Sequence, residues 1–135
     1  ITPDLQALFD QGNAVTTEAR QRYPGGVLVD NPAYDFIGSL KKTRELLAAH
    51  TSTVFEAAFE YKGCYARADI ITYNELNQRW SILEVKSTTK VKEEHIDDVG
   101  LQVWIMANAG LPIEKISIMH LNTLCKYPDL SNLFI

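Results

Sequence analysis

The chain has 135 residues, of which 46% are hydrophobic and 22% charged, and its formal net charge is −4 at pH 7. This composition excludes a disordered segment, and the acidic balance excludes a protein that wraps nucleic acid through bulk positive charge. No apolar run approaches the roughly 18 to 20 residues of a membrane-spanning helix, and the first residues carry acids instead of a basic signal sequence. We expect a single globular domain over residues 1–135, without a membrane partner and located in the cytoplasm. Because the sequence lacks an initiator Met, we expect it to be a fragment of a longer protein.

Two segments in the first part of the chain have helical spacing. Apolar residues recur every three or four positions after a Thr-Pro start, so residues 3–22 predict an amphipathic helix that "YPGG" ends. A short "VLVD" and a loop at "NPAYD" follow. Residues 37–50 then predict a second helix, with Leu40, Arg44 and Leu47 on one side.

The remaining elements are three strands, a long helix and a fourth strand. The strands are predicted at residues 53–61, 65–73 and 80–86, separated by polar turns. Residues 91–110 start with acids and end at a glycine, which predicts the helix, and residues 115–121 predict the last strand. The order predicts an α/β fold with an αβββαβ core and a mixed β-sheet flanked by helices, since the crossover helix can make the last pair of strands parallel.

The cysteines and tryptophans are assigned to structure. Cys64 and Cys125 have no partner at metal-ligand spacing, so the sequence predicts neither a zinc site nor an iron–sulfur cluster. We expect two buried thiols, with a disulfide as the alternative. Trp80 and Trp104 are expected to be core or interface aromatics.

Three charges lie inside or at the end of apolar strands, where Ile or Val would be expected. Glu84 and Lys86 are two apart and share a face, and a hairpin brings Asp69 of the preceding strand beside Glu84. Carboxylates bind Mg²⁺ or Mn²⁺, and an ammonium group can orient water or stabilise charge on phosphorus. The trio therefore predicts phosphodiester hydrolysis. The alternative is a simple cross-strand salt bridge.

The pattern E-x-K occurs twice, although chance predicts it roughly half a time, so the tripeptide alone is weak evidence. Glu60-Tyr61-Lys62 lies at a hairpin turn, where charges are expected. Glu84-Val85-Lys86 ends an apolar strand, follows the strand that carries an aspartate, and precedes a long helix. Its context distinguishes the second copy from the first.

The arrangement "RAD" in one strand, "EVK" in the next and then a helix with a glutamine resembles the PD-(D/E)XK nuclease superfamily, and within it the RecB-like branch. Longer segments also resemble the N-terminal nuclease-like domain of an uncharacterised group of bacterial proteins. These segments are "GNAVTTEARQRYPGG", "TVFEAAFEYKGCYARADI", "ILEVKSTTKVKEEHIDDVGLQVWIM", and "HLN" followed by "DLSNLF". The resemblance implies a restriction-endonuclease-like fold and a nuclease activity that depends on Mg²⁺ or Mn²⁺.

The resemblance also implies roles for individual residues. Asp69 and Glu84 would bind the metal together with the main-chain carbonyl of Val85, and Lys86 would be the catalytic lysine. Glu56 matches an upstream acid that some branches add to the metal site, and the alternative for Glu56 is a solvent-facing strand residue. The iron–sulfur cluster of some relatives is absent, because its four cysteines are missing.

A polar stripe on the long helix extends the candidate site. His95, Asp98 and Gln102 are spaced i, i+3 and i+7, which places them on one helix face. In the RecB-like branch a glutamine at this place lines the site, so the resemblance makes Gln102 a candidate catalytic residue, with simple helix–strand packing as the alternative. His95 is a further candidate on the same face. Met106 occupies the place of a tyrosine in that branch, and Thr16 that of a histidine.

The sequence as a whole predicts a nuclease that hydrolyses DNA, in repair, recombination or defence. The alternative is a catalytically inactive module that uses the same fold to dock nucleic acid or protein, with further domains of the same chain as expected partners. A group of basic residues is expected to be ordinary solvated charge, with a phosphate-binding face as the alternative. These residues are Arg20, Arg22, Lys41, Lys42 and Arg44.

Overall fold

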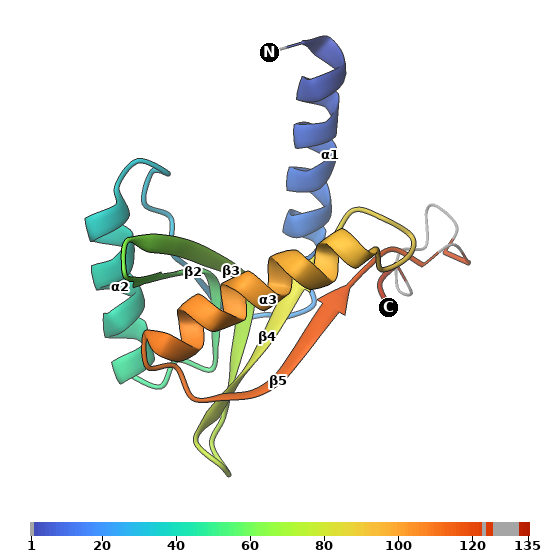
Figure 1. Ribbon diagram of the computed structural model, residues 1–135. Helices are drawn as coiled ribbons and strands as arrows, with labels where there is room; N and C mark the ends of the chain where they lie inside the picture. Colours follow the sequence, from blue (N-terminus) through green and yellow to red (C-terminus); the bar gives the residue numbers. More distant parts are fainter. Residues whose placement is uncertain (1, 123, 126–132) are drawn as a thin grey trace.

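The computed structural model describes residues 2–122, 124–125 and 133–135, and these contain three helices and five strands (Figure 1). In chain order the elements are α1 (Pro3–Arg20), β1 (Val27–Leu28), α2 (Phe36–Ala48), β2 (Thr53–Tyr61), β3 (Cys64–Asn74), β4 (Arg79–Val85), α3 (Glu93–Asn108) and β5 (Ile113–Met119). Residues 129–132 of the segment "DLSNLF" lie outside the described residues.

The strands form one mixed sheet in the order β1-β2-β3-β4-β5. β2, β3 and β4 are antiparallel neighbours, whereas β1 runs parallel to β2 and β5 parallel to β4. The fold is therefore α/β with a mixed sheet flanked by helices, as predicted. From α2 to β5 the elements follow the predicted order of helix, three strands, helix and strand. β1 was not predicted, because two residues are too few to show the alternation of a strand.

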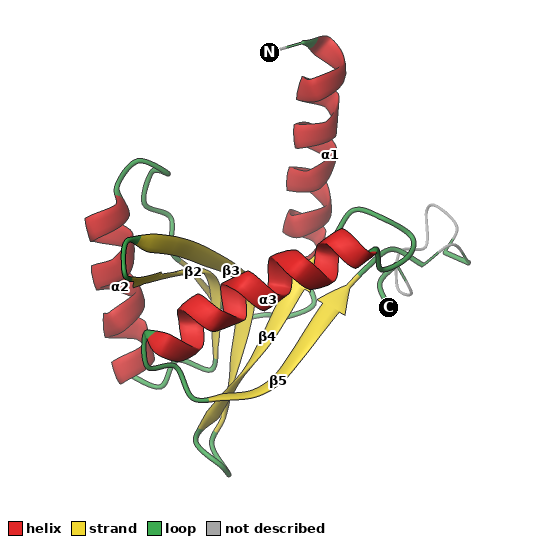
Figure 2. Ribbon diagram, in the orientation of Figure 1, coloured by secondary structure: helices red, strands yellow, loops and turns green. Residues whose placement is uncertain are grey.

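Different helices cover the two faces of the sheet (Figure 2). Side chains of α2 and α3 join the larger hydrophobic core on one face, and α3 crosses that face as the connection from β4 to β5. α1 meets the other face near its C-terminal end, where Ala19 is buried with Phe55, Ile70 and Val85. The rest of α1 extends beyond the sheet, and residues 2–7 are exposed.

Local capping determines where the first two helices start. The Thr2 hydroxyl accepts a hydrogen bond from the Leu5 N–H at 3.2 Å, and Pro3 needs no such partner because it has no N–H. The Asp35 carboxylate accepts one from Gly38 N–H at 3.0 Å, so α2 begins one residue before the predicted boundary. β4 ends at Val85, one residue before the predicted end, so Lys86 lies just beyond the strand.

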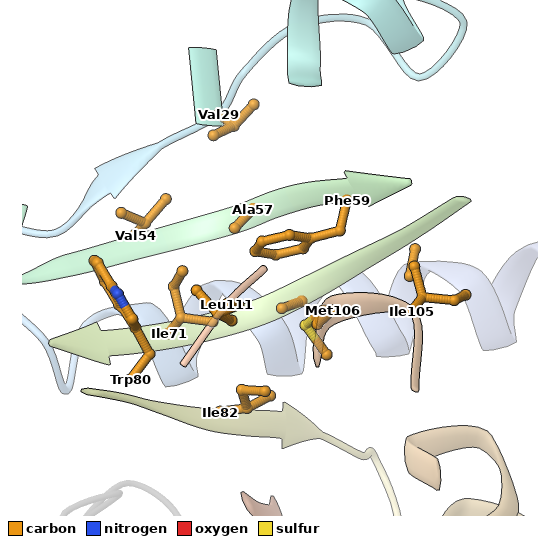
Figure 3. Packing of buried hydrophobic residues seen from close by; sticks show 12 residues of the cluster. Val29, Val54, Ala57, Phe59, Ile71, Trp80, Ile82, Ile105, Met106 and Leu111 are labelled. Carbon is orange, nitrogen blue, oxygen red and sulfur yellow. The ribbon is translucent and has the colours of Figure 1, made fainter. Parts of the chain in front are cut away.

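The larger core lies between the sheet and the helices α2 and α3 (Figure 3). Trp80 and Ile82 project from β4 into this core, and Met106 of α3 is completely buried in it. Of the two predicted alternatives, core or interface, Trp80 takes the core position, whereas Trp104 is 46% exposed and does not lie in the core. Trp104 lies on the outer part of α3 and contacts the edge of the Tyr61 ring.

The prediction of buried thiols is wrong for Cys64, which is exposed. Cys64 is the first residue of β3, directly after the turn at Lys62 and Gly63, where the chain has not yet entered the core. Cys125 is partly buried, and no disulfide joins the two cysteines. Within the described ranges, no helix combines the length and the apolar character needed to cross a membrane.

Candidate active site

The alternation of side chains between the two faces breaks once in each of two neighbouring strands. In β2, Val54 and Ala57 both belong to the larger core, although residues three apart on a regular strand point to opposite faces. In β3, Ala68 and Ile71 show the same spacing within that core. Both strands therefore contain a local irregularity at the same level of the sheet.

The irregular positions are occupied by Glu56 in β2 and Asp69 in β3. The paired residues on either side of them place Glu56 opposite Asp69. Glu56 has φ of 59°, in the left-handed region that non-glycine residues rarely adopt. Such a conformation is retained where surrounding contacts hold it, and it occurs preferentially at functional sites.

Two arginines hold Glu56 in place. Arg67 donates to the Glu56 carbonyl oxygen from Nε and Nη2, at 3.3 and 3.2 Å, and Nη2 also donates to the Val29 carbonyl at 2.9 Å. These bonds satisfy main-chain oxygens beside the irregular position. The Glu56 carboxylate pairs with Arg20 Nη2 at 3.1 Å and with Arg67 Nε at 3.6 Å. Glu56 is thus not a solvent-facing strand residue, and both of its oxygens are engaged.

Asp69 connects this position to β4. Its Oδ2 atom accepts a hydrogen bond from the Val85 N–H at 2.7 Å. The register of β3 with β4, in which Ile70 pairs with Leu83, places Asp69 beside Glu84. The hairpin therefore brings Asp69 and Glu84 together as the sequence predicts. Three carboxyl groups, from three adjacent strands, lie in a row across the sheet.

Burial raises the pKa of all three carboxyl groups. It is the main cause of the raised pKa of Glu56, and the Asp69 charge adds to it. Burial also raises the pKa of Asp69, against the lowering effect of the Val85 N–H. The pKa of Glu84 rises to about 8, first because of burial and then because of the neighbouring Asp69 charge. Without a cation, Glu84 therefore holds a proton at neutral pH.

Lys86 lies directly after β4 and points into the same region as Glu84. Its Nζ atom is 4.0 Å from Glu84 Oε1 and 3.9 Å from Asp98 Oδ2 of α3. Both distances are longer than a hydrogen bond, so the ammonium group lies between two carboxylates without a close bond to either. It can therefore donate to another group near Glu84.

Gln102 of α3 reaches the same cluster from above the sheet. A side-chain hydrogen bond from Gln102 lowers the pKa of Glu84, against the larger effect of burial. Gln102 Oε1 is buried and has no hydrogen-bond partner among the described residues. The same holds for Glu84 Oε2 when the carboxyl groups of Glu84 and Asp69 are both ionised. Buried oxygen atoms without a donor are costly unless a further group meets them.

Three other candidates lie outside this cluster. His95 is 7% exposed, and its Nδ1 accepts from the Lys92 N–H at 3.1 Å, so the ring caps the start of α3. Met106 belongs to the core. The Thr16 hydroxyl donates to the Gly12 carbonyl at 2.9 Å within α1.

Arg67 and Arg20 belong to the cluster but were not predicted as site residues. A signal for Arg67 was present, because it precedes Asp69 by two positions and shares its face of the strand. Arg20 lies 36 positions before its partner Glu56, and no local pattern connects them. Asp98 belongs to the predicted polar stripe, and its contact with Lys86 supports the orientation of that stripe toward the cluster.

The other basic residues that were considered for a phosphate-binding face have separate surroundings. Lys42 pairs with Asp30 at 3.0 Å, and Arg22 lies over the ring of Phe134 at 5.5 Å. Lys41 and Arg44 are exposed on α2.

The donors of the cluster fit a hard divalent cation in part. Carboxylate oxygens such as those of Asp69 and Glu84 are the ligands that Mg²⁺ and Mn²⁺ prefer, and the buried Glu84 Oε2 has no hydrogen-bond partner among the described residues. Among the described residues, however, no group of three or more His, Cys, Asp or Glu side chains is arranged to hold a metal ion. Glu56 is held by Arg20 and Arg67 instead, so the fit rests on two carboxylates.

The chain matches no family model, and comparisons with curated proteins and with solved structures give no match either.

Proposed function

We propose that this chain is a nuclease of the PD-(D/E)XK type, which hydrolyses phosphodiester bonds of DNA with Mg²⁺ or Mn²⁺. The observation that carries the proposal is the row of carboxyl groups of Glu56, Asp69 and Glu84, of which Glu84 is buried, with the Lys86 ammonium 4.0 Å from Glu84. The element order from α2 to β5 agrees with the restriction-endonuclease-like core that the resemblance implies.

The carboxylates of Asp69 and Glu84 and the main-chain carbonyl of Val85 would hold the divalent ion. Bound there, the ion would neutralise charge on the phosphate and lower the pKa of a water molecule. The residues of the chain prepare this site in its absence. The Val85 N–H donates to the Asp69 carboxylate at 2.7 Å, and burial raises the pKa of Glu84 to about 8, so a cation bound there would have to replace its proton.

Lys86 and Gln102 supply the polar groups nearest to the carboxylates. In hydrolysis a water oxygen forms a bond to phosphorus, the bond from phosphorus to the leaving oxygen breaks, and a proton passes to that oxygen. The Lys86 ammonium orients the water or stabilises the added negative charge, and the Gln102 amide orients either group. Arg67 donates to the Glu56 main-chain carbonyl and Arg20 pairs with the Glu56 carboxylate, and together they hold Glu56 beside Asp69.

A cleavage assay with a matched control tests this proposal. Linear and circular DNA, single- and double-stranded, are incubated with Mn²⁺, with Mg²⁺ and with EDTA. We expect cutting that needs the metal and that Lys86→Ala lowers by about a hundredfold or more. Lys62→Ala removes the lysine of the other E-x-K tripeptide, and we expect it to cut like the unaltered chain. Activity on circular DNA would indicate an endonuclease.

Equal cutting by the Lys86→Ala and Lys62→Ala variants would contradict the proposed role of Lys86. Loss of Mn²⁺ binding in Asp69→Ala, measured by calorimetry on a folded variant, would support the metal site. Unchanged Mn²⁺ binding in that variant would remove the basis of the proposal.

One observation favours the alternative of an inactive docking module. In the described part of the chain, the arrangement of acidic and other ligand side chains includes no three-residue metal group. A module of this kind would neither cut DNA under any condition nor bind Mn²⁺. Binding of Mn²⁺ without cutting would instead indicate a nuclease that needs further parts of a longer chain.

A further inference from the structure

A cavity of about 600 Å³ lies at the other end of the central strands, away from the carboxylates. Trp80 and Tyr73 line the cavity. Trp80 lies four residues before Glu84 in β4, and Tyr73 lies four residues after Asp69 in β3. Four residues of a strand span about 13 Å, so the cavity is separate from the candidate active site. Its volume is within the range of pockets that bind small ligands.

The cavity has an apolar floor and an aromatic wall. Phe59, Trp80 and Leu111 are the large buried side chains of its lining, and Thr43 and Ala58 are buried beside them. The Tyr73 ring lies between Trp80 and His50, with 4.8 Å between the ring centres on either side, and His50 is stacked on Tyr73 with an angle of 12° between the planes. Such a wall favours a flat aromatic ligand.

Polar side chains surround the opening. Arg44, Glu60 and Gln78 line the cavity and are exposed. Within the described residues, Arg44 and Glu60 form no ion pair or side-chain hydrogen bond with the protein. Together these groups offer hydrogen-bond donors, acceptors and one positive charge. They match a ring whose edge carries both donors and acceptors and whose substituent is anionic.

The backbone at the opening provides independent support. Four non-glycine residues in the described ranges have positive φ, and two of them, His50 (52°) and Gln78 (58°), line this cavity. His50 follows the C-cap of α2, a position where glycine is preferred because it has no Cβ. The chain thus carries side chains at two places where glycine would be less strained, and both side chains face the cavity.

We propose that this cavity binds a nucleobase, with the aromatic wall against the flat ring, Glu60 and Gln78 at its edge, and Arg44 near an attached phosphate. The base can belong to a free nucleotide or to an unpaired position in a DNA strand. Binding does not require the carboxylate cluster, so the proposal stands or falls separately from the nuclease activity.

His50→Gly tests the proposal, because it removes the ring and relieves the backbone at the same residue. Lys62→Gly is the matched control: Lys62 also has positive φ (49°), but it lies outside the cavity. Binding of the four deoxynucleosides and their 5′-monophosphates is measured by calorimetry in EDTA. A short single strand and the same strand with an abasic position complete the set of probes.

We expect at least one monophosphate to bind, His50→Gly to weaken its binding about tenfold or more, and Lys62→Gly to leave it unchanged. His50→Gly should unfold at the same or a higher temperature, which separates lost binding from lost folding. Arg44→Ala should weaken the monophosphate more than the nucleoside. Tighter binding of the intact strand than of the abasic strand or the free nucleotide would identify a strand base as the ligand, and the reverse order a free nucleotide. Absence of binding by every probe, or equal effects of His50→Gly and Lys62→Gly, would overturn the proposal.

Discussion

The two E-x-K tripeptides have the same pattern but different surroundings. Glu60 is exposed near the end of β2, and Lys62 lies in the following turn, with its Nζ 5.5 Å from the centre of the Tyr61 ring. Glu84 is only 6% exposed, and Lys86 lies between Glu84 and a carboxylate of α3. Water solvates the first pair, whereas neighbouring strands and a helix enclose the second.

The difference between them arises from the position of each tripeptide in the sheet. Glu60 pairs with Tyr65 at the end of a hairpin, so no other carboxyl group lies across from it. Glu84 is on a central strand, next to Asp69 and beneath α3. A Glu and a Lys two positions apart therefore form either a solvated turn or part of a cluster in which the pKa of Glu84 is raised.

Glu84→Gln should stabilise the chain at alkaline pH in the absence of metal. The pKa of Glu84 is about 8 in the folded state and near the ordinary value of 4.5 in the unfolded state. Between these values the folded state binds more protons, so stability falls as the pH rises from 4.5 to 8. Each pK unit corresponds to about 1.4 kcal/mol, so we expect the variant to gain on the order of a few kcal/mol at pH 8. Urea unfolding over this pH range measures the gain.

Glu60→Gln is the control for this measurement. Because Glu60 is exposed, its replacement should change the free energy of unfolding by less than about 0.5 kcal/mol at every pH. Below pH 4.5 the free energy of unfolding should depend on pH in the same way for Glu84→Gln and for the unaltered chain. If the stability curves of Glu84→Gln and the unaltered chain run parallel from pH 4.5 to 8, burial does not raise the pKa of Glu84.

Divalent cations should bind at the Glu84-Val85-Lys86 tripeptide with an affinity that depends strongly on pH. A cation must displace the proton of Glu84, so we expect the affinity for Mn²⁺ to rise about tenfold per pH unit below pH 8 and to level off above it. Calorimetry in two buffers with different ionisation enthalpies should detect about one proton released per ion at pH 7. Glu60→Gln should behave like the unaltered chain, and Glu84→Gln should lose binding. Retained binding with an affinity independent of pH would contradict the proposed ligand set.

Much of the fold was predictable because its signals are local. The periods of apolar residues located the helices and the four longer strands, and the order of elements predicted the mixed sheet. Boundaries shifted by one or two residues where a cap decided them, as Asp35 does for α2. β1 has only two residues, so its pairing with β2 depends on the sheet and not on its own sequence.

The site was predictable where one hairpin brings its residues together. The spacing of Asp69 and Glu84 in two successive strands was enough to place them side by side. The break in alternation at Glu56 was not predictable, because it depends on Arg67 and Arg20, and Arg20 comes from another helix far away in sequence. The cavity was also hidden, although Leu40, Arg44 and Leu47, expected on one side of α2, all line it. Its other walls come from β2, the β3–β4 hairpin and the end of α3.

The smallest effect concerns the lysines themselves. The Lys86 charge lowers the pKa of Glu84, so Lys86→Ala should raise that pKa further. Two unit charges 4 Å apart interact by about 1 kcal/mol in water and by more at a partly buried site, so we expect an upward shift of about one pH unit. A titration of the carboxyl carbons by nuclear magnetic resonance measures it, with Lys62→Ala as the variant that should leave Glu84 unchanged. If neither substitution changes the pKa of Glu84, the Lys86 ammonium interacts with Asp98 in preference to Glu84. The two tripeptides would then differ in burial alone. A shift confined to Lys86→Ala would instead show that the lysine and the carboxylate act as one electrostatic unit, which is the property that the proposed hydrolysis requires.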